Sequence, residues 1–437
     1  MRPPDDRGEG AAGYLAVVLL IVTVAGVVVS SGIPRDIVAG IKGAVCGLAQ
    51  DRECEGERRP GDSTTAAPVD DGKEWSGNPL PVGRDEWGNR PTDGLRKPPD
   101  PTEEEIRRGK EVAGQIRGHL DDDFAWHKPW TWGGDDSPDP RDALSRMSPG
   151  ELNALFGELS DDEIRRLLDM EGVPEILKVR ADQYLLRRLE EIEPHSIEPG
   201  VPARKSGGNE STNPITRHEY MTGPLFGESG RPSLIDVNQG ALGDCWWMAG
   251  LGALAHTGKG REVLEGMITQ NANGTYTVRF PDGESVTVTS SFVRRQDGSV
   301  AYAQPAPALW PLIMEKALAE KEGGYKEIDG GRAGEGMEIL TGKPGSEHDA
   351  EDVTRSDLER WLKEGKAVTV ATFSKDGAAK IDAYQAGRIY AYHSYVVRGF
   401  TGDGKVLLYN PWGYSHASVT MEEFNNLLRR VDVNDIG

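Results

Sequence analysis

Residues 239–250 read QGALGDCWWMAG, and they place one cysteine between a glycine turn and a run of apolar residues that continues to Ala255. Free cysteine is often a buried packing residue, so a purely structural role is the simpler interpretation. The turn at Gly243 and Asp244 predicts that a buried helix begins at Cys245. The unpaired amides and the dipole at such a helix start favour the thiolate, which is the nucleophilic form of cysteine.

A nucleophilic thiol needs a proton acceptor, and His393 in YAYHSYVV is the best placed histidine. Asn410 follows in YNPWG, and the short turn TGDG joins the two predicted strands, so the two side chains should lie close together. An asparagine can orient an imidazole by a hydrogen bond, and Trp412 would shield that bond from water. Gln239 and the backbone amide of Cys245 could hold the oxyanion of an acyl-transfer intermediate.

Each of these residues alone is more often structural, but their order and local context are specific. The stretch DVNQGALGDCWWMAGLGALA resembles the active-site segment of the calpains, which are papain-like cysteine proteases. The resemblance continues through LWPLIMEKALAEKEGGYKEIDGG, GEGMEILTG, HSYVVRGF and NPWG, and covers residues 225–412. It implies an α+β papain-like fold of two subdomains with a cleft between them. It also implies a nucleophile at Cys245, a general base at His393, an orienting amide at Asn410 and an oxyanion glutamine at Gln239.

The sequence departs from the calpain pattern at several positions. Tyr392 stands where calpains usually have glycine, and Leu234 stands where an activating arginine is expected. Asp236 and Glu315 match family calcium ligands and are the candidate metal residues, but the second subdomain is short and has no acidic loops. No EF-hand loop spacing occurs. We therefore expect no required cofactor, with calcium giving at most weak assistance.

The N-terminal residues 10–34 contain no charged residue and are long enough to span a bilayer as a helix. A cleaved signal peptide is the alternative. Cys46 and Cys54 follow closely, which predicts a disulfide in an oxidising compartment; two unrelated thiols are the other interpretation. The segment is similar to the prepilin-like export segment of polymorphic toxins from high-GC Gram-positive bacteria. That resemblance implies a membrane-anchored or secreted bacterial effector and, as a partner, an immunity or inhibitor protein.

Composition divides the rest of the 437 residues. The formal charge of −21 argues against a nucleic-acid partner. Residues 1–59 form the predicted export segment with its cysteine pair, and 60–105 a disordered linker rich in Pro, Gly and acidic residues. Residues 106–195 form a helical module, with capping boxes at Ser148 and Ser160 and a last helix over 174–192. Residues 212–437 form the protease domain.

Several elements are predicted within residues 212–437. Residues 274–292 read as a hairpin around a Pro-Asp-Gly turn, and 310–322 as a helix. Residues 388–400 and 405–410 read as paired strands, and 420–430 as a final capped helix. The resulting hypothesis is a cysteine endopeptidase acting on protein substrates. A catalytically degenerate binding module, and another acyl transfer such as deamidation or transglutamination, remain as alternatives.

Overall fold

The computed structural model describes residues 97–123, 139–201, 215–221, 223–227, 229–295, 299–304, 308–374, 384 and 388–436. The predicted export segment over residues 10–34, the Cys46–Cys54 pair and the linker up to residue 96 lie outside the described residues. Among the described residues, none of the helices combines the length and the apolar character needed to cross a membrane.

The helical module packs around its own apolar core. Its described helices are α4 (Glu103–Asp123), α5 (Pro140–Leu144), α6 (Pro149–Glu158), α7 (Asp161–Leu168), α8 (Val173–Arg180) and α9 (Gln183–Ile192). Both predicted capping boxes are confirmed, because the Ser148 and Ser160 side chains accept from Glu151 N and Glu163 N. The single helix predicted over residues 174–192 is wrong. It is divided at Ala181, because the Asp182 side chain caps a new helix by accepting from Leu185 N.

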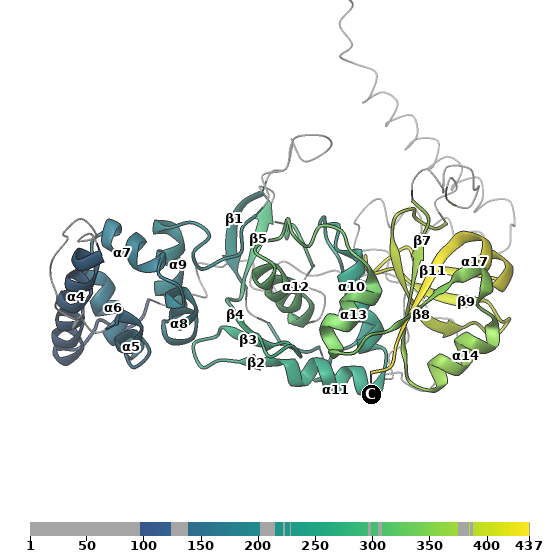
Figure 1. Cartoon of the computed structure of the whole chain (residues 1–437), viewed down its shortest axis with the longest axis horizontal. Helices are drawn as coiled ribbons and strands as arrows, with labels where there is room; N and C mark the ends of the chain where they lie inside the picture. The colour runs from purple at the N-terminus through teal and green to yellow at the C-terminus, as the bar shows by residue number, and fades with distance from the viewer. Residues whose placement is uncertain are drawn as a thin grey trace, which may run out of the picture. The chain divides into compact units, whose positions relative to one another are not determined.

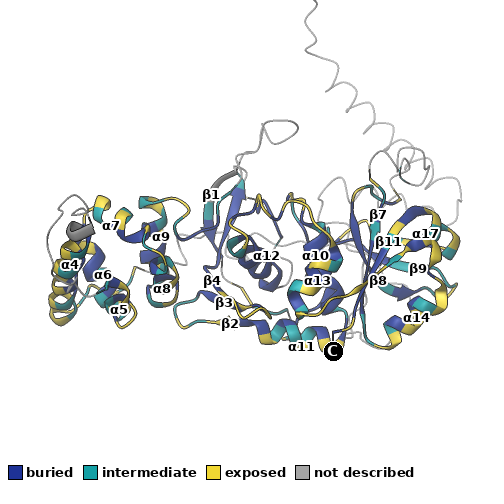
Figure 2. Ribbon diagram, in the orientation of Figure 1, coloured by how far each residue is buried: buried dark blue, intermediate teal, exposed yellow. Residues whose placement is uncertain are grey.

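The second core surrounds helix α10 (Cys245–Ala255), which is buried along nearly its whole length (Figure 2). It contains η4 (Leu234–Asp236), α11 (Gly258–Met267), α12 (Trp310–Lys321) and α13 (Ala333–Thr341). Two small sheets complete it: β2 (Ile268–Gln270), β3 (Tyr276–Arg279) and β4 (Ser285–Val288) form one, and β1 (Ile215–Tyr220) and β5 (Ser291–Arg295) form the other. The predicted hairpin is confirmed, because β3 and β4 are antiparallel.

The third core lies around a six-stranded sheet with the strand order β10-β9-β8-β7-β11-β6. Its strands are β6 (Ser346–Asp349), β7 (Ala367–Thr372), β8 (Ser394–Phe400), β9 (Val406–Tyr409), β10 (Ala417–Val419) and β11 (Leu428–Asn434). The short helices η5 (Ala350–Asp352), α14 (Arg355–Lys363) and α17 (Met421–Leu427) belong to the same part. α10 and α13 lie between this sheet and α12 (Figure 1).

Two predicted boundaries in this part are wrong. The strand expected from residue 388 begins only at Ser394, after a turn in which Tyr392 has a φ of 55°. The final helix expected through residue 430 ends at Leu427, and the chain continues as β11 between β7 and β6. Burial of Val431 and Val433 in the core of the sheet outweighs the helical pattern of the preceding residues.

A glycine allows the central helix to approach the sheet closely. A Cβ atom at Gly252 would lie 2.9 Å from Leu234 Cδ1 and 3.1 Å from Val396 Cγ2. Such distances are tighter than ordinary van der Waals contact, so a larger residue would push α10 away from β8. α10 begins at Cys245 and β8 follows His393, so this contact brings together the two elements that carry candidate catalytic residues.

Candidate active site

Cys245 is the first residue of α10, as predicted from the sequence. The loop before it is fixed by the Asp329 carboxylate, which accepts from Gly243 N at 3.0 Å. The indole of Trp246 donates to Ile328 O at 3.0 Å, so the first turn of the helix is held to the same segment. The thiol is partly exposed, while the helix behind it is buried. The backbone amides of Trp246 and Ser394 lie beside the sulfur and act to lower the pKa of the thiol.

His393 is held by its backbone at the end of β7. Its N–H donates to Thr372 Oγ1 at 2.9 Å, and its carbonyl accepts from Thr372 N at 2.9 Å and from Thr372 Oγ1 at 3.0 Å. The role of Thr372 was not predicted from the sequence. A threonine in a strand such as AVTVATF gives no local signal of this role, because the bonds depend on pairing with a segment 21 residues away.

Asn410 meets the imidazole as predicted, with its Oδ1 at 2.9 Å from His393 Nε2. Trp412 N donates to the same Oδ1 at 3.0 Å, so this atom must be the amide oxygen, which only accepts. Nε2 of neutral His393 consequently carries the proton and Nδ1 keeps a lone pair. Nδ1 is then the nitrogen that can accept a proton from Cys245. The Trp412 ring lies 4.5 Å from the imidazole ring and covers the pair.

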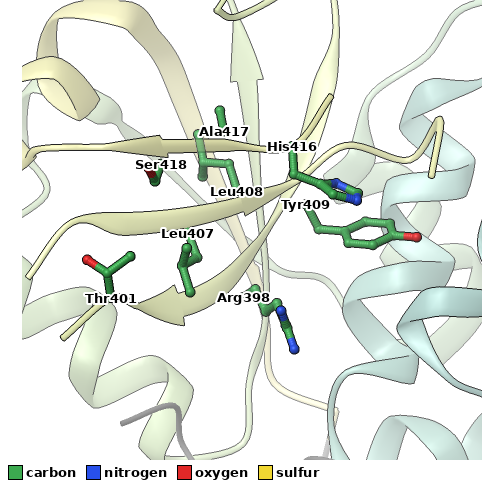
Figure 3. A pocket seen from close by; sticks show the side chains of 8 residues that line it. All are labelled: Arg398, Thr401, Leu407, Leu408, Tyr409, His416, Ala417 and Ser418. Atoms are coloured by element: carbon green, nitrogen blue, oxygen red, sulfur yellow. The ribbon is translucent and has the colours of Figure 1, made fainter. Parts of the chain in front are cut away.

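His416 positions Asn410 from the opposite side. Its Nδ1 accepts from Asn410 N at 2.9 Å, and its ring stacks on Tyr409 with centroids 4.3 Å apart. Figure 3 shows His416, Tyr409 and Arg398 on the wall of a smaller cavity of about 150 Å³. Because Nδ1 must be unprotonated to accept, the lowered pKa of His416, about 3 owing first to burial, keeps this bond intact at neutral pH. The role of His416 was not predicted from the sequence.

Cys245 and His393 line one cavity of about 660 Å³. Gln239 and Trp412 line it as well. Asn410 does not line the cavity, because it is fully buried and reaches the site only through its bond to His393. Gln239 Nε2 donates to Leu242 O at 2.6 Å. A substrate oxyanion would accept from the second hydrogen of the Gln239 side-chain amide, or it would replace Leu242 O as the acceptor of the first.

Burial disfavours charge on both members of the pair. It raises the pKa of the Cys245 thiol to about 11, although hydrogen bonds from Ser394 act in the opposite direction. It lowers the pKa of His393 to about 4, opposed by the bond to Asn410. Burial thus favours a neutral thiol and a neutral imidazole in the resting pair, and with that starting state the proton would move to His393 as the sulfur attacks.

We expect the rate at which iodoacetamide alkylates Cys245 to rise by nearly tenfold per pH unit from about pH 7 to about pH 10. The reason is that only the thiolate reacts, and its fraction grows with pH below a pKa of about 11. The rate would be measured by peptide mapping at a series of pH values. His393→Ala is the matched control and should give the same profile. A rate plateau from about pH 5 to about pH 8 that is lost in His393→Ala would instead show a preformed thiolate–imidazolium pair.

The calcium candidates lie in the interior and already accept hydrogen bonds. Asp236 Oδ2 accepts from the Trp310 indole at 2.7 Å and from Ser233 N at 2.9 Å. Both carboxylate oxygens of Glu315 lie 3.0 Å from Ala303 N. Within the described ranges no three His, Cys, Asp or Glu residues cluster as metal ligands would. Calcium needs six or more oxygens, so this donor set does not fit it.

Direct contacts join the second and third cores across the site. Tyr409 donates through its hydroxyl to Val237 O at 3.0 Å, and Gln239 N donates to Pro411 O at 2.7 Å. His256 Nε2 donates to Arg398 O at 2.7 Å. Leu234, which occupies the position of the expected arginine, is buried in the second core and forms no part of these contacts. These contacts connect the part of the chain that carries Cys245 with the part that carries His393.

Comparison with known proteins agrees with this geometry. Residues 214–421 match the family model described as calpain family cysteine protease. The calpain-type cysteine protease DEK1 of Arabidopsis thaliana is 31% identical over 207 residues, which are 43% of this chain and 9% of the relative. The calpain-1 catalytic subunit of Gallus gallus is 27% identical over 197 residues, covering 41% of this chain and 28% of the relative. The human calpain-1 catalytic subunit is 33% identical over 131 residues, covering 28% of this chain and 18% of the relative.

The chain thus spans less than a third of the length of these curated relatives. The similarity lies in the part that contains the second and third cores, and the helical module precedes the matched residues. The similarity to calpain-type proteases therefore concerns residues 214–421.

Proposed function

Because residues 214–421 form a calpain family cysteine protease domain, we propose that this chain hydrolyses peptide bonds in protein substrates by acyl transfer through Cys245. The observation that carries the proposal is the bond between His393 Nε2 and Asn410 Oδ1, since it leaves Nδ1 as a base in the cavity that Cys245 lines. Cysteine at a helix start, a base and an orienting group are the parts that this chemistry requires.

The reaction transfers the acyl group of the substrate twice, first to the Cys245 sulfur and then to water. Cys245 attacks the peptide carbonyl while His393 Nδ1 takes the thiol proton, and the oxyanion is held by Cys245 N–H and Gln239. The intermediate collapses to a thioester as His393 returns the proton to the leaving amine. A water molecule then gives its proton to His393 and attacks the thioester. The thiol is regenerated and a carboxylic acid leaves.

One incubation separates this function from its two alternatives. The full chain is mixed with an unfolded protein, and products are identified by mass spectrometry, with Cys245→Ala as the control that lacks the nucleophile. A protease gives new chain ends, each cut adding one water molecule. A deamidase or transglutaminase changes glutamine side chains without new ends. A binding module leaves the substrate unchanged, and that result would contradict the proposal.

We also propose that calcium is dispensable for this activity. Support comes from the hydrogen bonds that already occupy Asp236 and Glu315, and from the direct contacts between the two cores. Turnover should change by less than about threefold between excess chelator and about 1 mM calcium, measured on the same peptide. Loss of activity in chelator that calcium restores would show that an oxygen site forms by rearrangement of these residues.

For the whole chain we propose export from a bacterial cell, or anchoring in its membrane, as an effector. Support for this lies in the uncharged residues 10–34 and the nearby Cys46 and Cys54. An immunity or inhibitor protein is the corresponding partner. Fractionation of expressing cells, with mapping of the two cysteines without reductant, tests the proposal. A soluble intracellular chain with two alkylatable thiols would contradict it.

A further inference from the structure

The wall of the active-site cavity is locally basic. Arg332, Arg429 and Arg430 line it, and Asp329 is the single acidic residue among the described lining residues. This contrasts with the chain as a whole, whose formal charge is −21. The Asp329 carboxylate accepts from Gly243 N beside the nucleophile, so its charge is directed at that loop. The positive charges are therefore the feature of this wall that a bound peptide would meet.

Two of the three arginines are partly neutralised by the fold. Arg430 Nε lies 3.0 Å from Asp432 Oδ1, and its side chain is largely covered. Glu347 stands between Arg430 and Arg332, at 3.7 Å and 3.6 Å respectively. These carboxylates hold the two side chains in place and reduce their charge toward the cavity. Any strong preference must then come mainly from the third arginine.

Arg429 is presented by an irregularity in β11. Leu428 pairs with Thr372 and Arg430 pairs with Ala371 of β7, so Arg429 is the additional residue of a β-bulge. Bulges redirect a side chain and occur often beside active sites. Arg429 is exposed, and among the residues that the structure describes no carboxylate forms an ion pair with it. Its charge is available to a ligand.

The position of Arg429 relative to the reaction follows from the sheet. β8, β7 and β11 are neighbours (Figure 1), and Leu428, Thr372 and His393 follow one another across them. Strands lie about 4.8 Å apart, so the backbone next to Arg429 is about 10 Å from that of His393. An extended peptide rises about 3.3 Å per residue. Arg429 would consequently reach a group within about three residues of the bond cleaved.

We propose that Arg429, supported by Arg332 and Arg430, forms a subsite for a substrate carboxylate within about three residues of the scissile bond. The carboxylate belongs either to an Asp or Glu side chain or to the C-terminus of the peptide. Arginine binds carboxylates through two parallel hydrogen bonds, which a neutral amide of the same shape cannot match. The inference rests on the proposed proteolysis and adds to it the class of substrate.

The test uses a library of peptides from a digested proteome, incubated with the full chain and its variants. Mass spectrometry of the new ends gives the residues around each cut. Asp and Glu should be enriched at one position near the cut, and individual Glu peptides should be cleaved about tenfold faster than their Gln counterparts. Arg429→Gln should remove this preference, Arg429→Glu should replace it with a preference for Lys, and higher salt should weaken it. Amidated and free C-termini distinguish the two sources of the carboxylate.

Arg355→Gln is the matched control, because Arg355 is an exposed arginine on α14 that pairs with Glu359 away from the cavity lining. It should leave both rate and preference unchanged. Cys245-dependent cleavage with equal rates for Glu and Gln peptides would overturn the subsite and leave the protease function standing. An unchanged preference in Arg429→Gln would also overturn it. No cleavage of any peptide would remove the proposed function, and the subsite with it.

Discussion

Replacing Cys245 with alanine is expected to lower peptide turnover by about five orders of magnitude or more. The sulfur is the atom that forms the thioester, and no second cysteine lies among the described residues to replace it. Alanine favours helix, and the side chain at the first position of α10 is only partly buried, so the thermal midpoint should change by less than about 3 °C. Turnover and thermal unfolding are measured on the same protein preparation.

A double variant shows whether the predicted residues act as one unit. His393→Ala alone should lower peptide turnover nearly as much as Cys245→Ala does. The double variant should be no slower than either single variant, because each substitution removes the same step. Ser356→Ala is the control, because Ser356 is exposed on α14, and this variant should leave peptide turnover unchanged. Residual turnover above about one per cent in Cys245→Ala would show that another group is the nucleophile.

The sequence predicted those parts of the molecule whose causes are local. The capping boxes at Ser148 and Ser160, the β3–β4 hairpin and the helix start at Cys245 depend on neighbouring residues, and the structure contains them. The His393–Asn410 contact was predictable because a short turn joins β8 and β9, and His393 directly precedes β8 while Asn410 directly follows β9. In each case the deciding interactions span few residues.

The parts that could not be predicted depend on distant contacts or on backbone geometry. β11 was missed because the bulge at Arg429 interrupts the alternation of buried residues, and because burial between two strands decides its conformation. Tyr392 differs from the glycine that calpains usually have, and its φ of 55° shows why glycine suits this position. A tyrosine there is strained. The hydrogen bonds of its backbone N–H to Phe373 O and of neighbouring His393 to Thr372 hold this turn.

The segment between the predicted helical module and the predicted protease domain contains a buried acidic residue. Glu198 lies in a stretch that reads as a Pro- and Gly-rich break, yet its side chain is buried in the second core. Its Oε1 accepts from Thr289 Oγ1 and Ser291 Oγ, both at 2.6 Å, and its Oε2 pairs with Lys316 of α12. Sequence alone could not show this, because the partners lie more than 90 residues away. The segment joins the helical module firmly to the second core.

Breaking this buried ion pair is expected to lower the free energy of unfolding far more than breaking an exposed ion pair. Glu198→Gln keeps the shape of the side chain but leaves the charge of Lys316 buried without its counterion. The ammonium would retain only neutral oxygens, among them Ser291 O at 2.7 Å and Thr289 Oγ1 at 2.8 Å. The free energy of unfolding should fall by about 3–5 kcal/mol, which is a large share of the stability of a typical domain.

Urea unfolding followed by tryptophan fluorescence measures this loss, and two further variants identify its cause. Glu198→Gln combined with Lys316→Met removes both charges and should recover part of the loss, because no unpaired charge remains in the interior. Arg187→Gln breaks the exposed pair with Glu191, whose side chains are 44% and 62% exposed respectively, and should cost less than about 1 kcal/mol. If Glu198→Gln cost no more than that surface variant, water would have to reach Lys316, and the joint between the helical module and the second core would be looser than its hydrogen bonds indicate.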